Sequence, residues 1–143
     1  MARPQIKRKI CVPPKMIGFR PYGFTLCEIE TIKLTYEGYE SIRLVNYEML
    51  SQEQAAEQMN ISRPTLTRIY NKALKIVASA MIECKAIEIE GGNYHFEQEW
   101  FRCKKCHKLI QGLDNHTRCK DCTMFGTDEL IHINSKSNQL INK

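Results

Sequence analysis

The chain has 143 residues, a formal net charge of +5 and a hydrophobic content of 43%. This size and composition fit a soluble globular protein with one ordinary domain or two small ones. A membrane-spanning protein is excluded, because no apolar stretch of the sequence is long enough to cross a bilayer. The N-terminus is basic but lacks the apolar run of a secretory signal, so we expect a cytoplasmic protein in which disulfides are disfavoured.

Positive charge is concentrated in blocks along the chain. Residues 1–20 contain six Lys or Arg and no acid, residues 61–85 contain five and one Glu, and residues 102–120 contain six and one Asp. Such blocks can form positive faces that attract phosphate. Solvated protein surfaces are charged in any case, so charge alone favours nucleic-acid binding only modestly.

The first 24 residues are expected to form an irregular basic arm, because prolines and glycines interrupt any regular element. Flexible basic arms can enter the minor groove of DNA beside a helix that occupies the major groove. A disordered, solvated tail explains residues 1–10 equally well. The DNA-binding candidates in this segment are Arg3, Lys7, Arg8 and Lys9.

A first helix is expected over about Tyr36–Tyr47, after a segment at residues 25–34 that fits either a short helix or an extended lead-in. Two clearer helices follow. Ser51 and Gln54 form an S-x-x-Q capping box, which starts the first of the two. Asn60 can adopt the left-handed conformation that ends this helix, a role usually given to Gly.

Ser62 is positioned to cap a third helix, and Pro64 is tolerated there because it falls in the first turn. Apolar residues then recur at steps of three and four, which predicts a single apolar stripe over about four turns. The stripe comprises Leu66, Ile69, Tyr70, Ala73, Leu74, Val77, Ala78 and Met81.

These two helices predict a helix-turn-helix, whose second helix lies in the major groove of DNA. Ala55 and Ala56 allow close packing, and no acid occurs between Ile61 and Ile82 to repel the DNA backbone. Arg can bond guanine, Asn can bond adenine, and Thr or Lys can bond phosphate oxygens. The alternative, which periodicity alone favours, is a surface helix of a small helical bundle. The candidates on the open face are Arg63, Thr65, Thr67, Arg68, Asn71, Lys72 and Lys75.

Two C-x-x-C pairs dominate the last third of the chain. The alternation of residues 86–90 predicts a strand, and a second extended segment at about 94–102 leads into the first pair. The pairs are separated by twelve residues, and two such knuckles supply four sulfurs for one tetrahedral Zn²⁺. Four sulfurs close the coordination shell, so we expect a structural metal. The predicted ligands are Cys103, Cys106, Cys119 and Cys122.

Two other metal groups fit part of this pattern. Cys103–His107 matches the C-x-x-C-H pattern of c-type haem attachment, but haem attachment requires export and leaves the second pair unexplained. A rubredoxin-like iron site uses the same four sulfurs and stays open as an alternative. Cys11, Cys27 and Cys84 are expected to be buried small apolar residues rather than reactive thiols.

Several short motifs occur together in residues 1–92. They are Met1-Ala2-Arg3-Pro4, Arg8-Lys9-Ile10-Cys11, Phe19-Arg20-Pro21-Tyr22-Gly23, Glu40-Ser41-Ile42-Arg43-Leu44, Leu50-Ser51-Gln52-Glu53-Gln54-Ala55-Ala56-Glu57-Gln58-Met59, Ile61-Ser62-Arg63 and Lys85-Ala86-Ile87-Glu88-Ile89-Glu90-Gly91-Gly92. In this combination the chain resembles domain-of-unknown-function family 134, prokaryotic proteins described as predicted DNA-binding, with a helix-turn-helix similar to sigma-factor region four. The resemblance implies a transcription-regulator-like fold for this part. The chain differs from the family pattern at Asn60, where Gly is usual, and at Pro64, which removes one amide from the DNA-facing end.

We therefore expect a mainly α fold, with a basic arm and helix-turn-helix domain at residues 1–92, a β-rich zinc ribbon at 93–133 and a flexible tail at 134–143. The expected function is sequence-specific binding of double-stranded DNA by a transcriptional regulator, with RNA polymerase and a second copy of the chain open as further partners. The alternatives are a module that docks the transcription machinery and a sensor whose metal or thiols control DNA affinity. An enzyme is not expected, because the sequence has no carboxylate pair, open metal site, phosphate loop or activated nucleophile.

Overall fold

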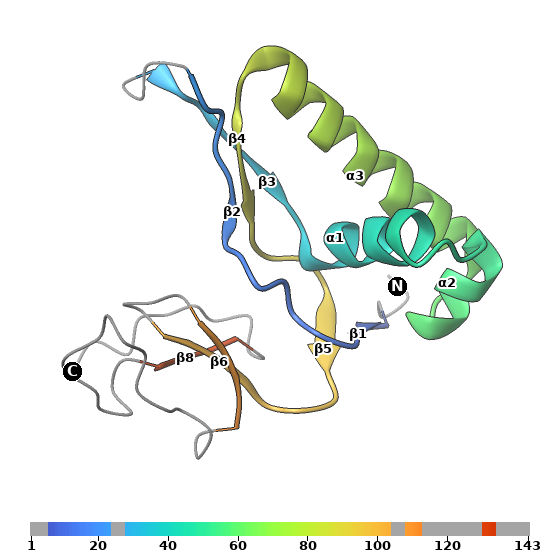
Figure 1. The fold of residues 1–143 in the computed structure, drawn as a ribbon. Helices are drawn as coiled ribbons and strands as arrows, with labels where there is room; N and C mark the ends of the chain where they lie inside the picture. Colours follow the sequence, from blue (N-terminus) through green and yellow to red (C-terminus); the bar gives the residue numbers. More distant parts are fainter. Residues whose placement is uncertain (1–5, 24–27, 104–107, 113–129, 134–143) are drawn as a thin grey trace, which may run out of the picture. The chain divides into compact units, whose positions relative to one another are not determined.

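The computed structural model describes residues 6–23, 28–103, 108–112 and 130–133 (Figure 1). These residues fall into two compact units, one within residues 1–10 and 17–95 and the other within residues 11–16 and 96–143. The loop at residues 11–16 therefore belongs with the cysteine-containing segment rather than with the helices. Within the described residues, no helix combines the length and apolar character that a membrane span requires.

Among the described residues, the first unit contains the helices and most of the strands. In chain order its elements are β1 (Arg8–Ile10), β2 (Gly18–Phe19), β3 (Thr31–Leu34), α1 (Tyr36–Ile42), the π-helical turn η2 (Arg43–Tyr47), α2 (Gln52–Gln58), α3 (Arg63–Glu83), β4 (Ala86–Ile89) and β5 (Tyr94–Phe96), whose last residue belongs to the second unit. The second unit continues with β6 (Trp100–Cys103), β7 (Leu109–Gln111) and β8 (Leu130–His132).

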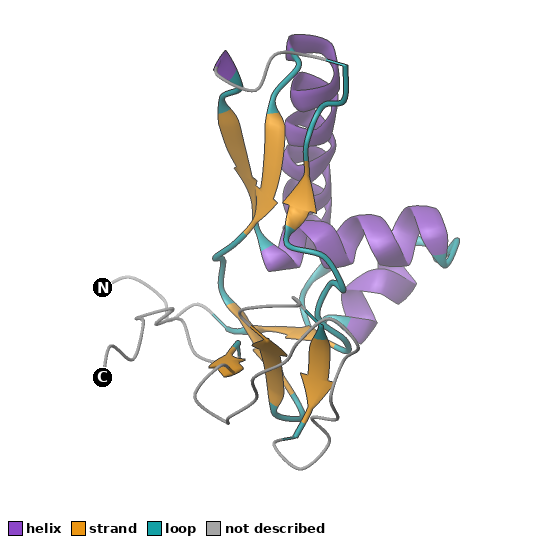
Figure 2. Ribbon diagram, turned by 60° about the vertical axis from the view of Figure 1, so that its left-hand side comes forward, coloured by secondary structure: helices purple, strands orange, loops and turns teal. Residues whose placement is uncertain are grey.

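The fold is α/β, so the expectation of a mainly α protein is wrong. The strands of the described residues, orange in Figure 2, form three small sheets. Their orders are β1–β5, β2–β4–β3 and β7–β6–β8. Most of these strands could not be recognised from the sequence because they are two to four residues long, too short for a clear period of two. The expected irregular arm is also interrupted, since β1 and β2 lie within it.

The β2–β4–β3 sheet supports the long helix α3, which contacts both β3 and β4 (Figure 1). β3 and β4 are parallel, and the connection between them contains α1, η2, α2 and α3. Parallel neighbours need such a long crossover, whereas β2 runs antiparallel to β4. Gly18 permits close approach of β2, because a Cβ at this position would overlap the carbonyl oxygen of Ile87.

The predicted helix over Tyr36–Tyr47 is present as α1 followed directly by η2. Thr35 caps α1, and its hydroxyl accepts a hydrogen bond from the Gly38 amide at 3.1 Å. At the end of η2 the Glu48 amide donates to the Arg43 carbonyl at 2.9 Å, a bond five residues long. Met49 then reverses the chain at a φ of 58°.

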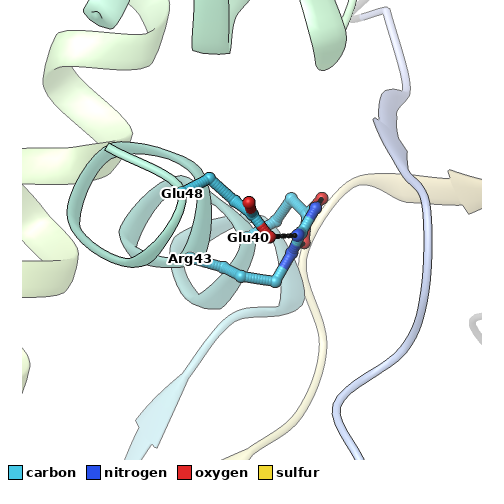
Figure 3. A network of polar contacts seen from close by, with 3 residues as sticks. All are labelled: Glu40, Arg43 and Glu48. Atoms are coloured by element: carbon cyan, nitrogen blue, oxygen red, sulfur yellow. Dashed lines mark hydrogen bonds and ion pairs between the residues drawn. The ribbon is translucent and has the colours of Figure 1, made fainter. Parts of the chain in front are cut away.

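A polar network ties α1 to the end of η2 (Figure 3). Arg43 donates to both carboxylate oxygens of Glu40, from Nη2 at 2.7 Å and from Nε at 2.9 Å. It also donates from Nη1 to Glu48 at 3.1 Å. Glu40 is only 1% exposed, so the bidentate guanidinium compensates for the loss of water around its charge. Removing Arg43 would leave that carboxylate buried without its counter-charge.

α2 and the start of α3 pack around one apolar cluster. Leu44, Ala55, Ala56, Met59 and Leu66 are buried there, with Val45, Leu50 and Ile61 packed against them. Two adjacent alanines allow the backbone of α2 to approach its neighbours closely. The same residues therefore fix the angle at which α2 meets α3.

The apolar stripe of α3 is narrower than the sequence predicted. Leu66, Ala73 and Ala80, seven residues apart, are its fully buried members. Leu74 and Met81, assigned to the same stripe, are 39% and 74% exposed. The physical reason is that α1, β3 and β4 cover one sector of the helix, whereas steps of three and four place apolar residues over a wider one.

The second unit is built on the antiparallel β7–β6–β8 sheet. Phe101, Cys103 and Ile110 form its buried cluster among the described residues, with Leu130 packed against them. Arg102 is also buried, and it donates to the carbonyl of Pro14 at 2.6 Å and to that of Lys15 at 3.0 Å. These bonds attach the loop at residues 11–16 to β6.

Candidate nucleic-acid interface

The corner formed by α2, the turn at residues 59–62 and α3, here called the α2–α3 corner, is set by local hydrogen bonds. Ser51 and Gln54 make the predicted capping box, with distances of 3.0 and 3.2 Å. Asn60 has a φ of 55°, and its amide donates to the Glu57 carbonyl at 3.0 Å. The next amide, that of Ile61, donates to Ala56 at 3.0 Å, which completes a Schellman motif.

Ser62 caps α3 as predicted, since its hydroxyl accepts from the Thr65 amide at 3.4 Å. Pro64 occupies the first turn and has no N–H to donate. With the Thr65 amide taken by the cap, the Arg63 amide is the donor of this turn that could meet an anion. The helix N-terminus alone is therefore a weak phosphate site, in line with the loss of one amide at Pro64.

The predicted DNA-facing residues of α3 divide into exposed and engaged side chains. Thr65 is half-buried, and its hydroxyl lies 2.8 Å from that of Ser62. Thr67 is also half-buried, and it donates to Gln52 of α2 at 2.5 Å, so its hydroxyl joins the two helices. The exposed members are Arg63, Arg68, Asn71, Lys72 and Lys75.

Arg63 makes one ion pair, from Nη1 to Glu53 at 3.3 Å. Both side chains are more than 60% exposed, at 61% and 73%, so the pair contributes little and Arg63 can exchange partners. Within the described residues, the side chains of Arg68, Asn71, Lys72 and Lys75 make no ion pair or hydrogen bond. In this part of the chain, none of the four is held by a partner.

A groove of about 610 Å³ runs between the residues around β1 and the first half of α3. Ile6 and Arg8 line it, together with Glu37 of α1, which pairs with Arg8. The other lining residues come from α3 and the turn before it and are Asn60, Ile61, Ser62, Thr65, Arg68, Ile69 and Lys72. The sequence alone does not indicate this groove, because it joins residues around β1 to residues of α3 that are more than fifty positions away.

The segment expected to be a flexible arm is held against the first unit from Arg8 onward. The Arg8 amide donates to Asn93 and the Lys9 amide to Met59, both at 3.0 Å. The Arg8 side chain pairs with Glu37, with 3.0 Å between Nε and Oε2 and exposed fractions of 14% and 15%. Among the predicted arm residues, Lys7 is exposed and Arg3 lies outside the described residues.

Strand β5 pairs with β1 and so helps to hold the segment that begins at Arg8. Tyr94 packs on Tyr36 with 4.6 Å between ring centroids. Burial, followed by the neighbouring Tyr36, raises the pKa of Tyr94 to about 12. The ring therefore stays neutral over the whole physiological range and keeps β1 and β5 beside α1.

One of the four predicted metal ligands lies in the described residues. Cys103 is fully buried at the end of β6, and its amide donates to the Lys108 carbonyl at 3.1 Å. Cys106, Cys119 and Cys122 lie outside the described residues, and no group of three or more ligand side chains occurs within them. A buried thiol beside a β-hairpin fits one ligand of a four-cysteine site.

The three remaining cysteines differ from expectation where the structure describes them. Cys11 and Cys84 are exposed rather than buried, and Cys27 lies outside the described residues. Cys84 ends α3 in the left-handed conformation at a φ of 56°. The expectation of burial came from the apolar character of cysteine, which does not tell that this residue ends a helix at the surface.

The described residues define an α/β protein of two units with an exposed, positively charged face on α3. A family model described as a protein of unknown function, DUF134, matches residues 1–97. The UPF0251 protein of Moorella thermoacetica is 39% identical over 131 residues, covering 91% of this chain and 86% of that protein. The UPF0251 protein of Clostridium novyi is 40% identical over 85% of this chain and 84% of its own length. The UPF0251 protein of Methanocella arvoryzae is 35% identical, with coverages of 88% and 78%.

The chain therefore belongs to the UPF0251 family of DUF134 proteins. No solved structure matches it. The family name assigns no activity, so the function has to be argued from the residues.

Proposed function

We propose that this protein is a sequence-specific DNA-binding regulator of transcription, with the α2–α3 corner acting as a helix-turn-helix similar to sigma-factor region four. In this proposal α3 lies in the major groove of double-stranded DNA, and α2 crosses the backbone. The observation that carries it is the exposed face of α3, where five basic or amide side chains project and no acid occurs between residues 61 and 82.

The construction of the corner supports the same function. A helix that reads bases must be held rigidly by the helix before it, because a small tilt would misplace its side chains. Here both helices are capped, and the turn has the bonds of a Schellman motif. Thr67 also bonds Gln52 across the two helices. The face of α3 is thus fixed without using Arg68, Asn71 or Lys72.

We propose a structural role for the cysteine pairs. Cys103, Cys106, Cys119 and Cys122 would hold one Zn²⁺, which supplies stability to the second unit and no chemistry. The support is the small apolar cluster of that unit and the burial of the Cys103 thiol within it. Metal analysis of the purified protein decides between zinc and the iron that the same sulfurs can bind.

Selection of bound sequences from a pool of random duplexes tests the proposed function. Wild-type protein should enrich one motif. Asn71→Ala should lose about 5- to 140-fold in affinity for that motif, the effect of about 1–3 kcal/mol, and should relax the preference at one base pair. Lys33→Ala, an exposed residue of β3, is the surface control and should enrich the wild-type motif. Failure of the wild type to enrich any sequence would overturn the proposal and favour a protein-docking module.

A further inference from the structure

We propose that the groove beside α3 binds the sugar–phosphate backbone of one DNA strand, so that Arg68 and Lys72 hold phosphates while Asn71 reads bases. This inference rests on the proposed function, because it names the part of the DNA that each side of α3 meets. It assigns Arg68 to a phosphate, although the chemistry of its guanidinium also suits guanine.

The charge of the groove favours a polyanion. Arg8 and Glu37 line it and neutralise each other in a pair that is largely shielded from water. Arg68 and Lys72 line it too, and neither has a recorded ion-pair partner among the described residues. Two positive charges are left facing one groove, which suits phosphate.

The spacing along α3 suits neighbouring groups on one strand. Arg68 and Lys72 are four residues apart, so they lie on the same side of the helix and about 6 Å apart along its axis. Thr65 lines the groove one turn earlier. Long cationic side chains at this spacing can reach successive phosphates of a strand that runs along the groove.

The apolar part of the groove suits deoxyribose. Ile6, Ile61 and Ile69 line it alongside the charged residues. A hydrated inorganic ion gains nothing from such a surface, whereas sugar carbons between two phosphates can cover it. The groove therefore combines the two surfaces that a nucleic-acid backbone presents.

The width of the DNA major groove determines which part of the DNA each side of α3 can meet. A helix with its side chains is about 10–12 Å across, and the major groove is about 12 Å wide. The major groove of DNA can therefore hold α3, but it has no space for the β1 segment beside α3. Residues of α3 that face this segment must therefore meet the rim of the DNA groove, which is backbone. Asn71 is exposed and about 100° around the helix from Lys72, and it does not line the groove beside α3, so in this proposal it meets the bases.

The test is equilibrium binding of the full chain to the selected duplex and to a random duplex of the same length, over a series of salt concentrations. Lys72→Ala and Arg68→Ala should weaken binding to both duplexes by the same factor and leave their ratio unchanged. Each should reduce the slope of log K against log salt by about 0.9, the loss of one phosphate contact. Asn71→Ala should instead lower the ratio with no change in slope, and Lys33→Ala should change neither.

The outcomes separate this inference from the proposed function. A wild type that binds both duplexes equally would contradict sequence reading, while reduced salt slopes of Lys72→Ala and Arg68→Ala would still support the backbone site. If the wild type prefers the selected duplex and these two substitutions alter the ratio alone, they read bases and the inference is overturned. It is also overturned if they change neither quantity, or if the wild type binds no DNA.

Discussion

The α2–α3 corner and the cysteine-containing second unit are stabilised in different ways. Both helices of the corner are capped, and its apolar side chains share one buried cluster with Leu44 of η2. The described part of the second unit has strands of three or four residues around Phe101, Cys103 and Ile110. Burial of apolar surface can therefore hold the corner, whereas the apolar cluster within the described part of the second unit is smaller.

This difference also separates the proposed roles. A surface that reads DNA must keep its geometry when its exposed side chains are changed, and the corner meets this requirement because its core lies beneath them. The second unit attaches the loop at residues 11–16 through Arg102, a basic residue that is buried and bonded to backbone carbonyls. At least this basic residue serves stability rather than DNA affinity.

The largest expected effect is the loss of the second unit when its metal is removed. Structural zinc contributes on the order of 10 kcal/mol to folding of small metal-bound modules. A chelator should therefore shift the fluorescence of Trp100, the single tryptophan and a residue of β6, to longer wavelength. The helical circular dichroism signal of α1, α2 and α3 in the first unit should remain.

Two cysteine substitutions control this experiment. Cys103→Ser should reproduce the effect of the chelator, whereas Cys11→Ser, at an exposed cysteine outside the two pairs, should leave the fluorescence unchanged. Loss of the helical signal together with the tryptophan shift would contradict independent stabilisation of the two units.

A smaller effect is expected from the core of the corner. Leu66→Ala removes a fully buried side chain and should lower the free energy of unfolding by about 2–5 kcal/mol. Leu74→Ala, on the same helix but 39% exposed, should cost less than about 1 kcal/mol. Chemical denaturation followed by the helical signal measures both. Equal losses would mean that the single wide stripe predicted from periodicity describes α3 better than the narrow one.

The smallest effect concerns the turn of the corner. Asn60→Ala should cost about 1 kcal/mol, because a side chain beyond Gly, Asn or Asp is strained at a φ of 55°. Asn60→Gly should stabilise the protein by about a few tenths of a kcal/mol, since Gly is the usual residue in this position. Both values come from the same denaturation measurement. An unchanged stability of Asn60→Ala would show that the left-handed turn is not maintained in solution.

The sequence predicted the parts of the fold that depend on near neighbours. The partners of helix caps and turn residues lie within one helical turn, so the sequence was enough to predict their roles. The predictions for Ser51 with Gln54, for Asn60 and for Ser62 are confirmed. The Glu40–Arg43 pair, three residues apart on a helix, is a further local feature of this kind.

Features that join distant segments could not be predicted. The parallel pairing of β3 with β4 spans all the helices, and the contact of Arg8 with Glu37 joins an apparent arm to α1. The groove beside α3 exists only once both are formed. Periodicity also cannot say how wide a sector of α3 its neighbours cover, which is why Leu74 and Met81 were misplaced.

The central claim, that α3 selects a DNA sequence, is tested most directly by one ratio. The dissociation constants of the wild-type protein for its selected duplex and for a random duplex of equal length are measured at the same near-physiological salt concentration. The account predicts that the selected duplex binds about 10³-fold more tightly or better. A ratio near one would contradict it.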